Sequence, residues 1–111
     1  MSVAVDLAEL PTAIAGQIGW CYLLTVSDEG QPRVLAVAPE IAADGSLCFE
    51  VGRGTASNVA ARPSITLVYP PATPEAMSLI VDGTATVDGS SVALAATWAV
   101  LHRSAVRQAD A

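Results

Sequence analysis

Residues 47–69 constrain the fold more than any other part of this sequence. Apolar runs at 47–51 and 65–69 have the length and composition of strands, and a glycine-bracketed turn at 52–54 follows the first run. Pro63 closes the segment before the second run, because a proline cannot continue a helix. The sequence therefore predicts a strand, a tight turn, a helix of about two turns and a second strand.

The turn between these runs gathers groups that bind anions. Arg53 carries a guanidinium, Thr55 and Ser57 carry hydroxyls, and the start of a helix leaves backbone N–H groups unpaired. Together with the helix dipole, these groups favour a phosphate. The alternative interpretation is an ordinary helix cap, since a Thr or Ser cap stabilises a helix by about 1 kcal/mol without any ligand.

The remaining apolar runs predict a mainly β, antiparallel protein with a closed or partly closed barrel. Strands are expected at residues 20–27, 33–41 (broken late by Pro39), 47–51, 65–69 and 77–87, with turns at 28–31, 44–45 and 88–89. Residues 92–101 fit a strand and a helix equally well. Helical spacing at 6–17 predicts a helix capped by Asp6, which Pro11 keeps short or bent.

Length and charge exclude several classes of protein. The 111 residues predict a single domain over 1–111, with residues 104–111 frayed. No apolar stretch is long enough for a membrane span and no secretion signal is visible, so a cytoplasmic protein is expected. The net charge of −6, with arginine as the only strong base, argues against nucleic acid as a partner. Cys21 and Cys48 lie in apolar runs and are expected to be buried free thiols.

Four segments in order resemble the split-barrel flavin-binding proteins, the superfamily of pyridoxamine 5'-phosphate oxidase and the deazaflavin-dependent reductases. They are residues 23–34 (LLTVSDEGQPRV), 44–47 (DGSL), 55–67 (TASNVAARPSITL) and 79–87 (LIVDGTATV). The resemblance implies a six-stranded split barrel. With the residue patterns, it predicts a six-stranded antiparallel split β-barrel with a short N-terminal helix and a short helix after the third strand. It also implies a homodimer with two cofactor sites across the subunit interface.

The resemblance also implies which residues contact the cofactor. The strand at 33–38 matches the one that flanks the flavin, which implicates Arg33, Val34, Leu35, Ala36 and Val37. A second set begins with Arg53, Gly54 and Thr55, which match the phosphate-binding residues of the family, and Asn58, which matches a recurrent polar residue on the following helix. Ser57 joins this set because its hydroxyl lies in the turn itself. Thr55 departs from the family, because a lysine or arginine is common there. A charged hydrogen bond of this kind is worth about 1.5–3 kcal/mol.

The function implied is an FMN- or deazaflavin-dependent oxidoreductase that transfers hydride to a small organic acceptor. No catalytic side chain or metal site is predicted, because a flavin ring carries hydride chemistry itself. Nothing matches the C-terminal extension with which the oxidases hold a pyridoxal-type substrate, so pyridoxamine phosphate oxidation is not expected. The alternative is a non-catalytic ligand-binding protein with weakened or lost cofactor binding. A third option is haem binding, for which His102 is the candidate ligand.

Several other side chains have a structural and a functional interpretation. Arg33 either reaches the cofactor or lies at an exposed strand end, and Arg62 suits the dipole at the end of the helix. His102, with Arg103 beside it, could bind an anionic tail. Trp20 and Trp98 are expected in the core or a dimer interface, or against a flavin ring.

Overall fold

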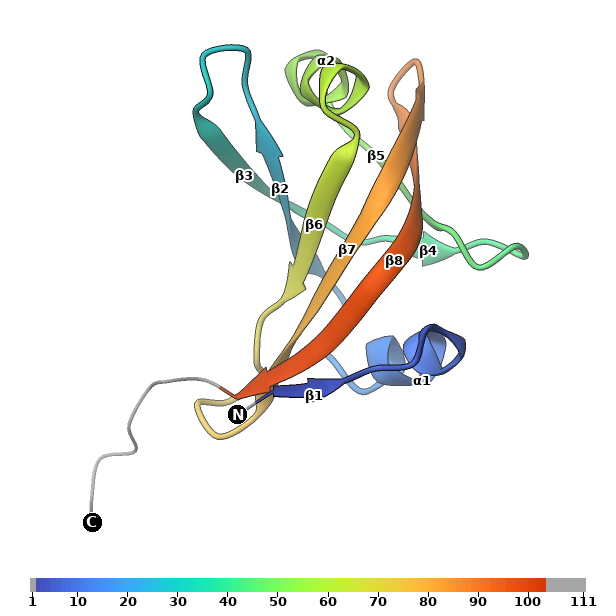
Figure 1. Ribbon diagram of the computed structural model, residues 1–111, viewed down its shortest axis with the longest axis vertical. Helices are drawn as coiled ribbons and strands as arrows, with labels where there is room; N and C mark the ends of the chain where they lie inside the picture. The colour runs from blue at the N-terminus through green and yellow to red at the C-terminus, as the bar shows by residue number, and fades with distance from the viewer. Residues whose placement is uncertain (1, 104–111) are drawn as a thin grey trace.

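The computed structural model describes residues 2–103, whose strands form one curled antiparallel sheet (Figure 1). The strands are β1 (Ser2–Ala4), β2 (Cys21–Val26), β3 (Pro32–Val37), β4 (Glu40–Ile41), β5 (Leu47–Glu50), β6 (Ser64–Tyr69), β7 (Met77–Asp88) and β8 (Ser91–Arg103). The helical elements are the 3-10 turn η1 (Leu7–Glu9), α1 (Leu10–Ala15) and α2 (Arg53–Ala61). The predicted mainly β class, with a short N-terminal helix and a short helix after the third predicted strand, is confirmed.

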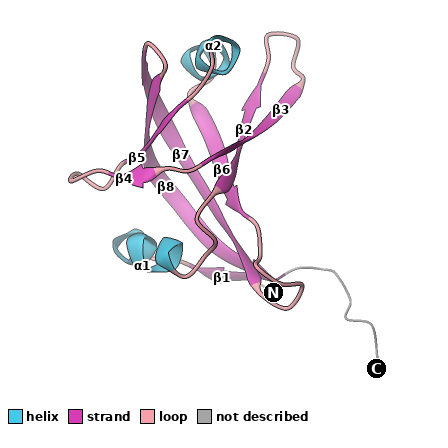
Figure 2. Cartoon of the chain, turned by 180° about the vertical axis from the view of Figure 1, so that it is seen from behind, coloured by secondary structure: helices cyan, strands magenta, loops and turns pink. Residues whose placement is uncertain are grey.

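The sheet follows the order β3-β2-β6-β7-β8-β5-β4, and β1 pairs with β8. Because β3 leads almost directly into β4, the two ends of this order are joined by the chain itself, and the sheet curls into a half-barrel (Figure 2). A cavity lined by residues 36–38 on one side and 48–50 on the other occupies the split between β3 and β5. Six longer strands therefore form the split barrel, and the short β1 and β4 extend it.

The predicted turns are confirmed at three glycines. Gly30, Gly45 and Gly89 have φ values of 80°, 89° and 62°, in the left-handed region that favours glycine. They close the β2–β3, β4–β5 and β7–β8 hairpins, as the Glu-Gly and Asp-Gly pairs predict. The ambiguous segment at 92–101 is a strand, because it pairs along its length with β7.

The core fills the concave side of the sheet, and α2 covers one end of it. On β2, Cys21, Leu23 and Thr25 face inward, and their partners Val37, Leu35 and Arg33 on β3 share that face. The largest fully buried side chains are Tyr69, Leu23, Leu47, Leu67, Leu79, Leu94, Val59, Val81, Val92 and Cys21. Val59 belongs to α2, so the helix of the 47–69 segment is anchored in the core.

The N-terminal helix differs from its prediction over 6–17. It consists of η1 and the six-residue α1, with Pro11 in the first turn of α1, where a proline is tolerated. Asp6 precedes η1 but makes no side-chain cap hydrogen bond, so its predicted capping role is wrong. Among residues 2–103, no helix is long and apolar enough to cross a membrane. The predicted frayed tail at 104–111 lies outside the described residues.

Both cysteines are free, as predicted, but only Cys21 is fully buried and Cys48 is half-buried. Burial raises the pKa of the Cys21 thiol to about 11, and a hydrogen bond with Tyr69 partly offsets the shift. Burial also raises the pKa of the Tyr69 hydroxyl. In the folded protein both groups are therefore neutral at physiological pH.

Alkaline pH is expected to destabilise the protein. Above pH 9.0, the ordinary pKa of cysteine, the thiol of residue 21 ionises in the unfolded chain while it stays protonated in the folded one. The folded state then binds more protons, so the Cys21 thiol lowers the free energy of unfolding by about 2–3 kcal/mol between pH 9 and pH 11. The raised pKa of Tyr69 adds a further fall in the same direction above pH 10. Urea titrations across this range measure the slope. The variant Cys21→Ala should show a shallower slope, and an unchanged slope would contradict the assignment.

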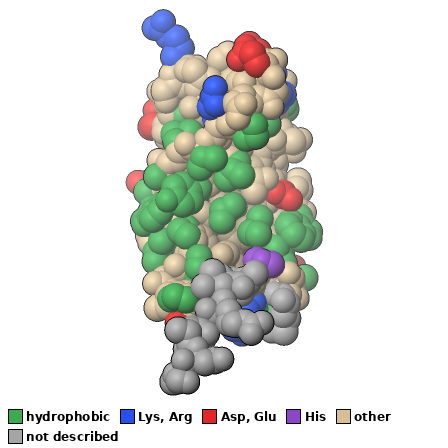
Figure 3. Space-filling view, turned by 90° about the vertical axis from the view of Figure 1, so that its left-hand side faces the viewer, with side chains coloured by type: hydrophobic (Ala, Val, Ile, Leu, Met, Phe, Trp, Pro, Cys, Tyr) green, Lys and Arg blue, Asp and Glu red, His purple; other side chains and the backbone are tan. Residues whose placement is uncertain are grey.

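One side of the sheet faces away from the core and carries many apolar side chains. We call it the outer face: Tyr22, Leu24, Val26, Val34, Ala36, Thr66, Val68, Ile80, Asp82, Trp98 and Val100. Figure 3 shows hydrophobic side chains gathered across the middle of one side of the molecule. Val34, Trp98 and Tyr22 are 59%, 49% and 40% exposed. An apolar surface of this extent is typical of an interaction site.

Candidate functional site

The N-terminus of α2 begins without a side-chain cap. Gly52 occupies the cap position with extended backbone (φ −76°, ψ 172°), and no side chain bonds to the first turn. Thr55 and Ser57 lie within the helix, so the alternative that they form an ordinary cap is wrong. The amide of Ala56 is the first to bond back, to the carbonyl of Gly52. The preceding amides therefore remain available to an anion.

A cavity of about 340 Å³ lies at this helix start. It is lined by Arg53 and Ala56 of α2 and by Gly89 and Ser90 of the β7–β8 turn. Arg53 is exposed, so its guanidinium can turn toward an anion without leaving water. No sequence pattern predicts that Gly89 and Ser90 lie near Arg53, because the Asp-Gly pair at 88–89 indicates only a turn.

The helical phase of α2 separates the predicted phosphate residues. Arg53 and Ser57 are four positions apart and lie on one exposed side of the helix. Thr55 and Asn58 are half-buried on the other side, and Gly54 is exposed between the two sides. The five residues therefore do not lie on one side of the helix, and Arg53 is the one of them that lines the cavity.

The strand predicted to flank the flavin is β3, an edge strand of the sheet. Arg33, Leu35 and Val37 share the inward row, whereas Val34 and Ala36 belong to the outer face. Ala36 and Val37 also line the cavity in the split, which has a volume of about 360 Å³. The predicted strand thus reaches both the split and the outer face.

The cavity in the split contains two carboxylates. Glu40 and Glu50 line it together with Cys48 and Phe49. The hydroxyls of Ser91 and Ser90 donate to the Glu50 carboxylate at 2.5 and 2.8 Å, and they lower its pKa. The charges of Glu40 and Glu50 disfavour a phosphate in the split and leave room there for a neutral ring. Glu50 is also held by Ser90, which lines the cavity at the start of α2, so Arg53 has to offset this charge where a phosphate binds.

Arg33 and Arg53 lie at opposite ends of α2. Arg53 begins α2 and lies near the β7–β8 turn. Arg33 lies on β3, in the β2–β3 hairpin, and Arg62 connects the C-terminal end of α2 to that hairpin. A nine-residue helix spans about 14 Å. The guanidinium of Arg33 donates to the carbonyl of Pro32 at 3.4 Å. The two arginines therefore belong to different parts of the fold, and Arg53 is the one that lines the cavity at the start of α2.

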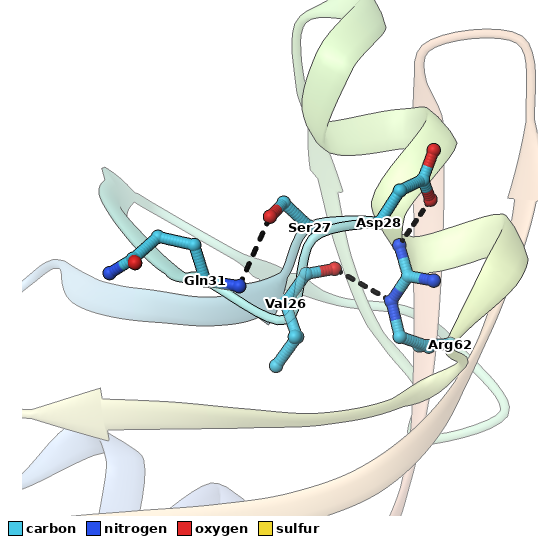
Figure 4. Close-up of polar contacts among 5 residues, drawn as sticks. All are labelled: Val26, Ser27, Asp28, Gln31 and Arg62. Atoms are coloured by element: carbon cyan, nitrogen blue, oxygen red, sulfur yellow. Dashed lines mark hydrogen bonds and ion pairs between the residues drawn. The ribbon is translucent and has the colours of Figure 1, made fainter.

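Arg62 ties the end of α2 to the β2–β3 hairpin (Figure 4). Its Nε donates to the carbonyl oxygen of Val26 at 2.7 Å, and one terminal nitrogen contacts the Asp28 carboxylate at 2.9 Å. The predicted dipole role accounts only for the position of this arginine at the helix end. The structure assigns it a tertiary contact that spans 34 to 36 residues of sequence.

Replacing Arg62 with alanine is expected to lower the free energy of unfolding by about 1–2 kcal/mol. The change removes a charged hydrogen bond to a backbone carbonyl and a partly exposed ion pair. Urea denaturation measures the difference. The control Asp28→Asn removes only the ion pair and should cost less than about 1 kcal/mol. Equal losses in both variants would contradict the larger role of the Val26 contact.

The two tryptophans, Tyr22 and His102 lie toward the solvent. Trp98 is about half exposed beside Asp82, and Trp20 packs edge-on against Tyr22 with ring centroids 4.9 Å apart. The expectation that the two tryptophans belong to the core is therefore wrong, because the core is filled by aliphatic residues together with Phe49 and Tyr69. His102 Nδ1 lies 3.2 Å from the Ser2 hydroxyl. Residues 2–103 contain no cluster of ligands for a metal ion.

Comparisons with known proteins found both sequence relatives and structural neighbours. No family model matches the chain. Two mycobacterial proteins, Mb0449c of Mycobacterium bovis and MT0457 of Mycobacterium tuberculosis, both named as uncharacterized, are 32% identical over 117 residues. Each alignment covers 91% of this chain and 82% of the relative.

Three solved structures share the fold. The FAD binding protein from Mycobacterium smegmatis superposes with a TM-score of 0.64 at 16% identity, over 93% of this chain and all of the other. HupZ of Group A Streptococcus gives 0.59 at 15%, over 88% and 89%. The heme binding protein from Mycobacterium smegmatis gives 0.56 at 22%, over 78% of this chain and 39% of that one.

Proposed function

This chain belongs to the same family as Mb0449c and MT0457 of the mycobacteria, and we propose that it is a homodimeric oxidoreductase that binds FMN or a deazaflavin coenzyme and transfers hydride to a small organic acceptor. Its fold is shared with proteins named as FAD-binding and heme-binding. The observation that carries the proposal is the uncapped start of α2 beside the cavity that Arg53 lines.

The phosphate end of the coenzyme is assigned to the start of α2. Free backbone N–H groups, the helix dipole and the Arg53 guanidinium all favour a dianion there. Thr55 carries no charge, so Arg53 is the residue that supplies a positive charge to the phosphate. Ser57 lies on the same side of the helix and adds a hydroxyl.

The ring is assigned to the neighbourhood of β3 and the split. Val37 and Phe49 offer apolar surface there, and Glu40 and Glu50 disfavour the phosphate. When bound, the flavin supplies the hydride chemistry. The chain's own residues bind the coenzyme, orient it along β3 and exclude water from it.

The homodimer is supported by the outer face. Val34 and Ala36 belong both to this apolar surface and to the strand assigned to the ring. A second copy packed on the outer face would cover the exposed aromatic side chains and complete the wall of the coenzyme site. The two parts of the proposal therefore share the same strand.

Haem binding is the second candidate, and the position of His102 favours it. The Ser2 hydroxyl lies against Nδ1, which leaves Nε2 directed elsewhere on an exposed ring. On β8, Trp98 and Val100 belong to the outer face, and His102 is the next residue in the same row. Its cross-strand partner on β7 is Ser78. An imidazole nitrogen beside an apolar surface is a suitable ligand for haem iron.

Cofactor titration of the purified protein tests the proposal. FMN or a deazaflavin should bind with a shifted absorbance band, near 450 nm for the flavin and about 400–420 nm for the deazaflavin, and the loaded protein should accept hydride from a reduced nicotinamide. Failure to bind either coenzyme overturns the proposal. Haem binding with a Soret shift that His102→Ala removes would favour the second candidate.

Replacing Arg53 with alanine is expected to weaken FMN binding by about tenfold or more, because a charged hydrogen bond to phosphate is lost. Riboflavin, which lacks the phosphate, should bind wild type and variant equally. Arg103→Ala is the matched control, since Arg103 donates to the Glu75 carbonyl far from α2. Fluorescence titration measures all of these affinities. Equal FMN affinity in Arg53→Ala and wild type would refute the phosphate assignment.

A further inference from the structure

A third cavity, of about 310 Å³, lies on the other side of the β4–β5 hairpin from the split. Its walls come from η1 and α1, from the hairpin and from the middle of β8. On the hairpin, the pair Glu40 and Cys48 faces the split, whereas the next pair, Ile41 and Leu47, faces this cavity. Because neighbouring pairs on a ribbon point to opposite sides, the two cavities are separate.

The lining of this cavity is apolar except at the tip of the β4–β5 hairpin. Leu10 and Leu47 are buried at its floor, whereas Leu7 and Ile41 are each 41% exposed. Apolar side chains that line a concave site and stay in water are typical of small-molecule pockets. An apolar cavity of about 150 Å³ can hold benzene, so a cavity of 310 Å³ has room for one aromatic ring with a substituent.

Within the part of the chain that the structure describes, Asp44 is the one charged residue that lines the cavity, and no basic residue does. Asp44 lies at the tip of the hairpin, where the backbone amide and the hydroxyl of Ser46 both donate to its Oδ1. These bonds fix the carboxylate and lower its pKa, so it is ionised at neutral pH. The charge attracts a cationic or hydrogen-bond-donating end and repels an anion.

We propose that this cavity is a binding site for a compact aromatic amine, with the ring among Leu7, Leu10, Ile41 and Leu47 and the ammonium group directed to Asp44. The charge disfavours phosphates and carboxylates, so the site differs in ligand class from the coenzyme site. It goes beyond the proposed oxidoreductase function and does not depend on it.

The test uses three probes that share one ring: benzylamine, benzyl alcohol and benzoate. Each is titrated into the full chain without coenzyme, and backbone amide shifts are followed by NMR. Benzylamine should bind with a dissociation constant of about 1 mM and shift amides in residues 7–14 and 41–47. Benzoate should bind at least about fivefold more weakly. Shifts elsewhere, or equal binding of benzoate and benzylamine, would overturn the proposal.

Variants separate the charge from the cavity. Asp44→Asn keeps an acceptor for the Ser46 amide and should weaken benzylamine by about fivefold while benzyl alcohol is unaffected. Ala96→Leu fills the cavity and should remove binding of both, with Ala8→Leu as a second filling variant if the first does not fold. Ala60→Leu, on the exposed side of α2, is the control and should bind like wild type. Unchanged binding in a folded filling variant would place the site elsewhere.

Discussion

Alanine in place of Gly83 is expected to lower the free energy of unfolding by about 3 kcal/mol or more. A Cβ at this position would lie 2.4 Å from the carbonyl oxygen of Ala95 and 2.6 Å from a methyl carbon of Leu94. The first of these atoms is backbone, so no side-chain rotation relieves the clash. Gly83 is buried at the irregular pairing between β7 and β8, where the longest hairpin of the sheet would have to shift.

A second glycine gives the matched control. Gly54 lies in α2, and a Cβ added there would meet nothing within 4 Å, so Gly54→Ala should leave stability unchanged or raise it by up to about 1 kcal/mol. Urea denaturation of both variants without coenzyme measures the difference. A loss below about 1 kcal/mol in Gly83→Ala would show that the sheet adjusts at this point, and would contradict the packing argument.

The strands and turns could be predicted because their signals are local. Asp-Gly and Glu-Gly pairs mark the hairpins, Pro39 and Pro63 mark the ends of elements, and the residues between them are apolar. Residues 92–101 gave no such signal, since a segment apolar on nearly every side suits a strand and a helix alike. Hydrogen bonding with β7 makes this segment a strand, and that pairing depends on the order of strands in the sheet, which no local pattern shows.

Only those parts of the candidate site that depend on local sequence could be predicted. The helix start at Arg53 follows from the glycines beside it, but the approach of Gly89 and Ser90 depends on how β8 returns beside β5. The separation of Thr55 from Ser57 follows from the helical period once the buried side is known. The contact between Arg62 and the β2–β3 hairpin joins distant segments that no local pattern links.

Glutamate in place of Val34 is expected to weaken the proposed homodimer by about a hundredfold or more, so that the variant sediments as a monomer at micromolar concentration. Val34 is 59% exposed on the outer face, so the change is tolerated in a single subunit. In a dimer the carboxylate would be buried against apolar side chains at a cost of several kcal/mol. Asp82, on the same face, adds like charge.

The control is the same substitution on the opposite side of the sheet. Val3 is 45% exposed and pairs with Leu101, whose own partner Leu79 faces the core, so Val3→Glu adds an equal charge away from the outer face. It should sediment like wild type, and both variants should unfold at similar urea concentrations. If wild type itself sediments as a monomer, the apolar face is not covered by a second copy. If only Val34→Glu loses both the dimer and FMN affinity, β3 serves the interface and the coenzyme together.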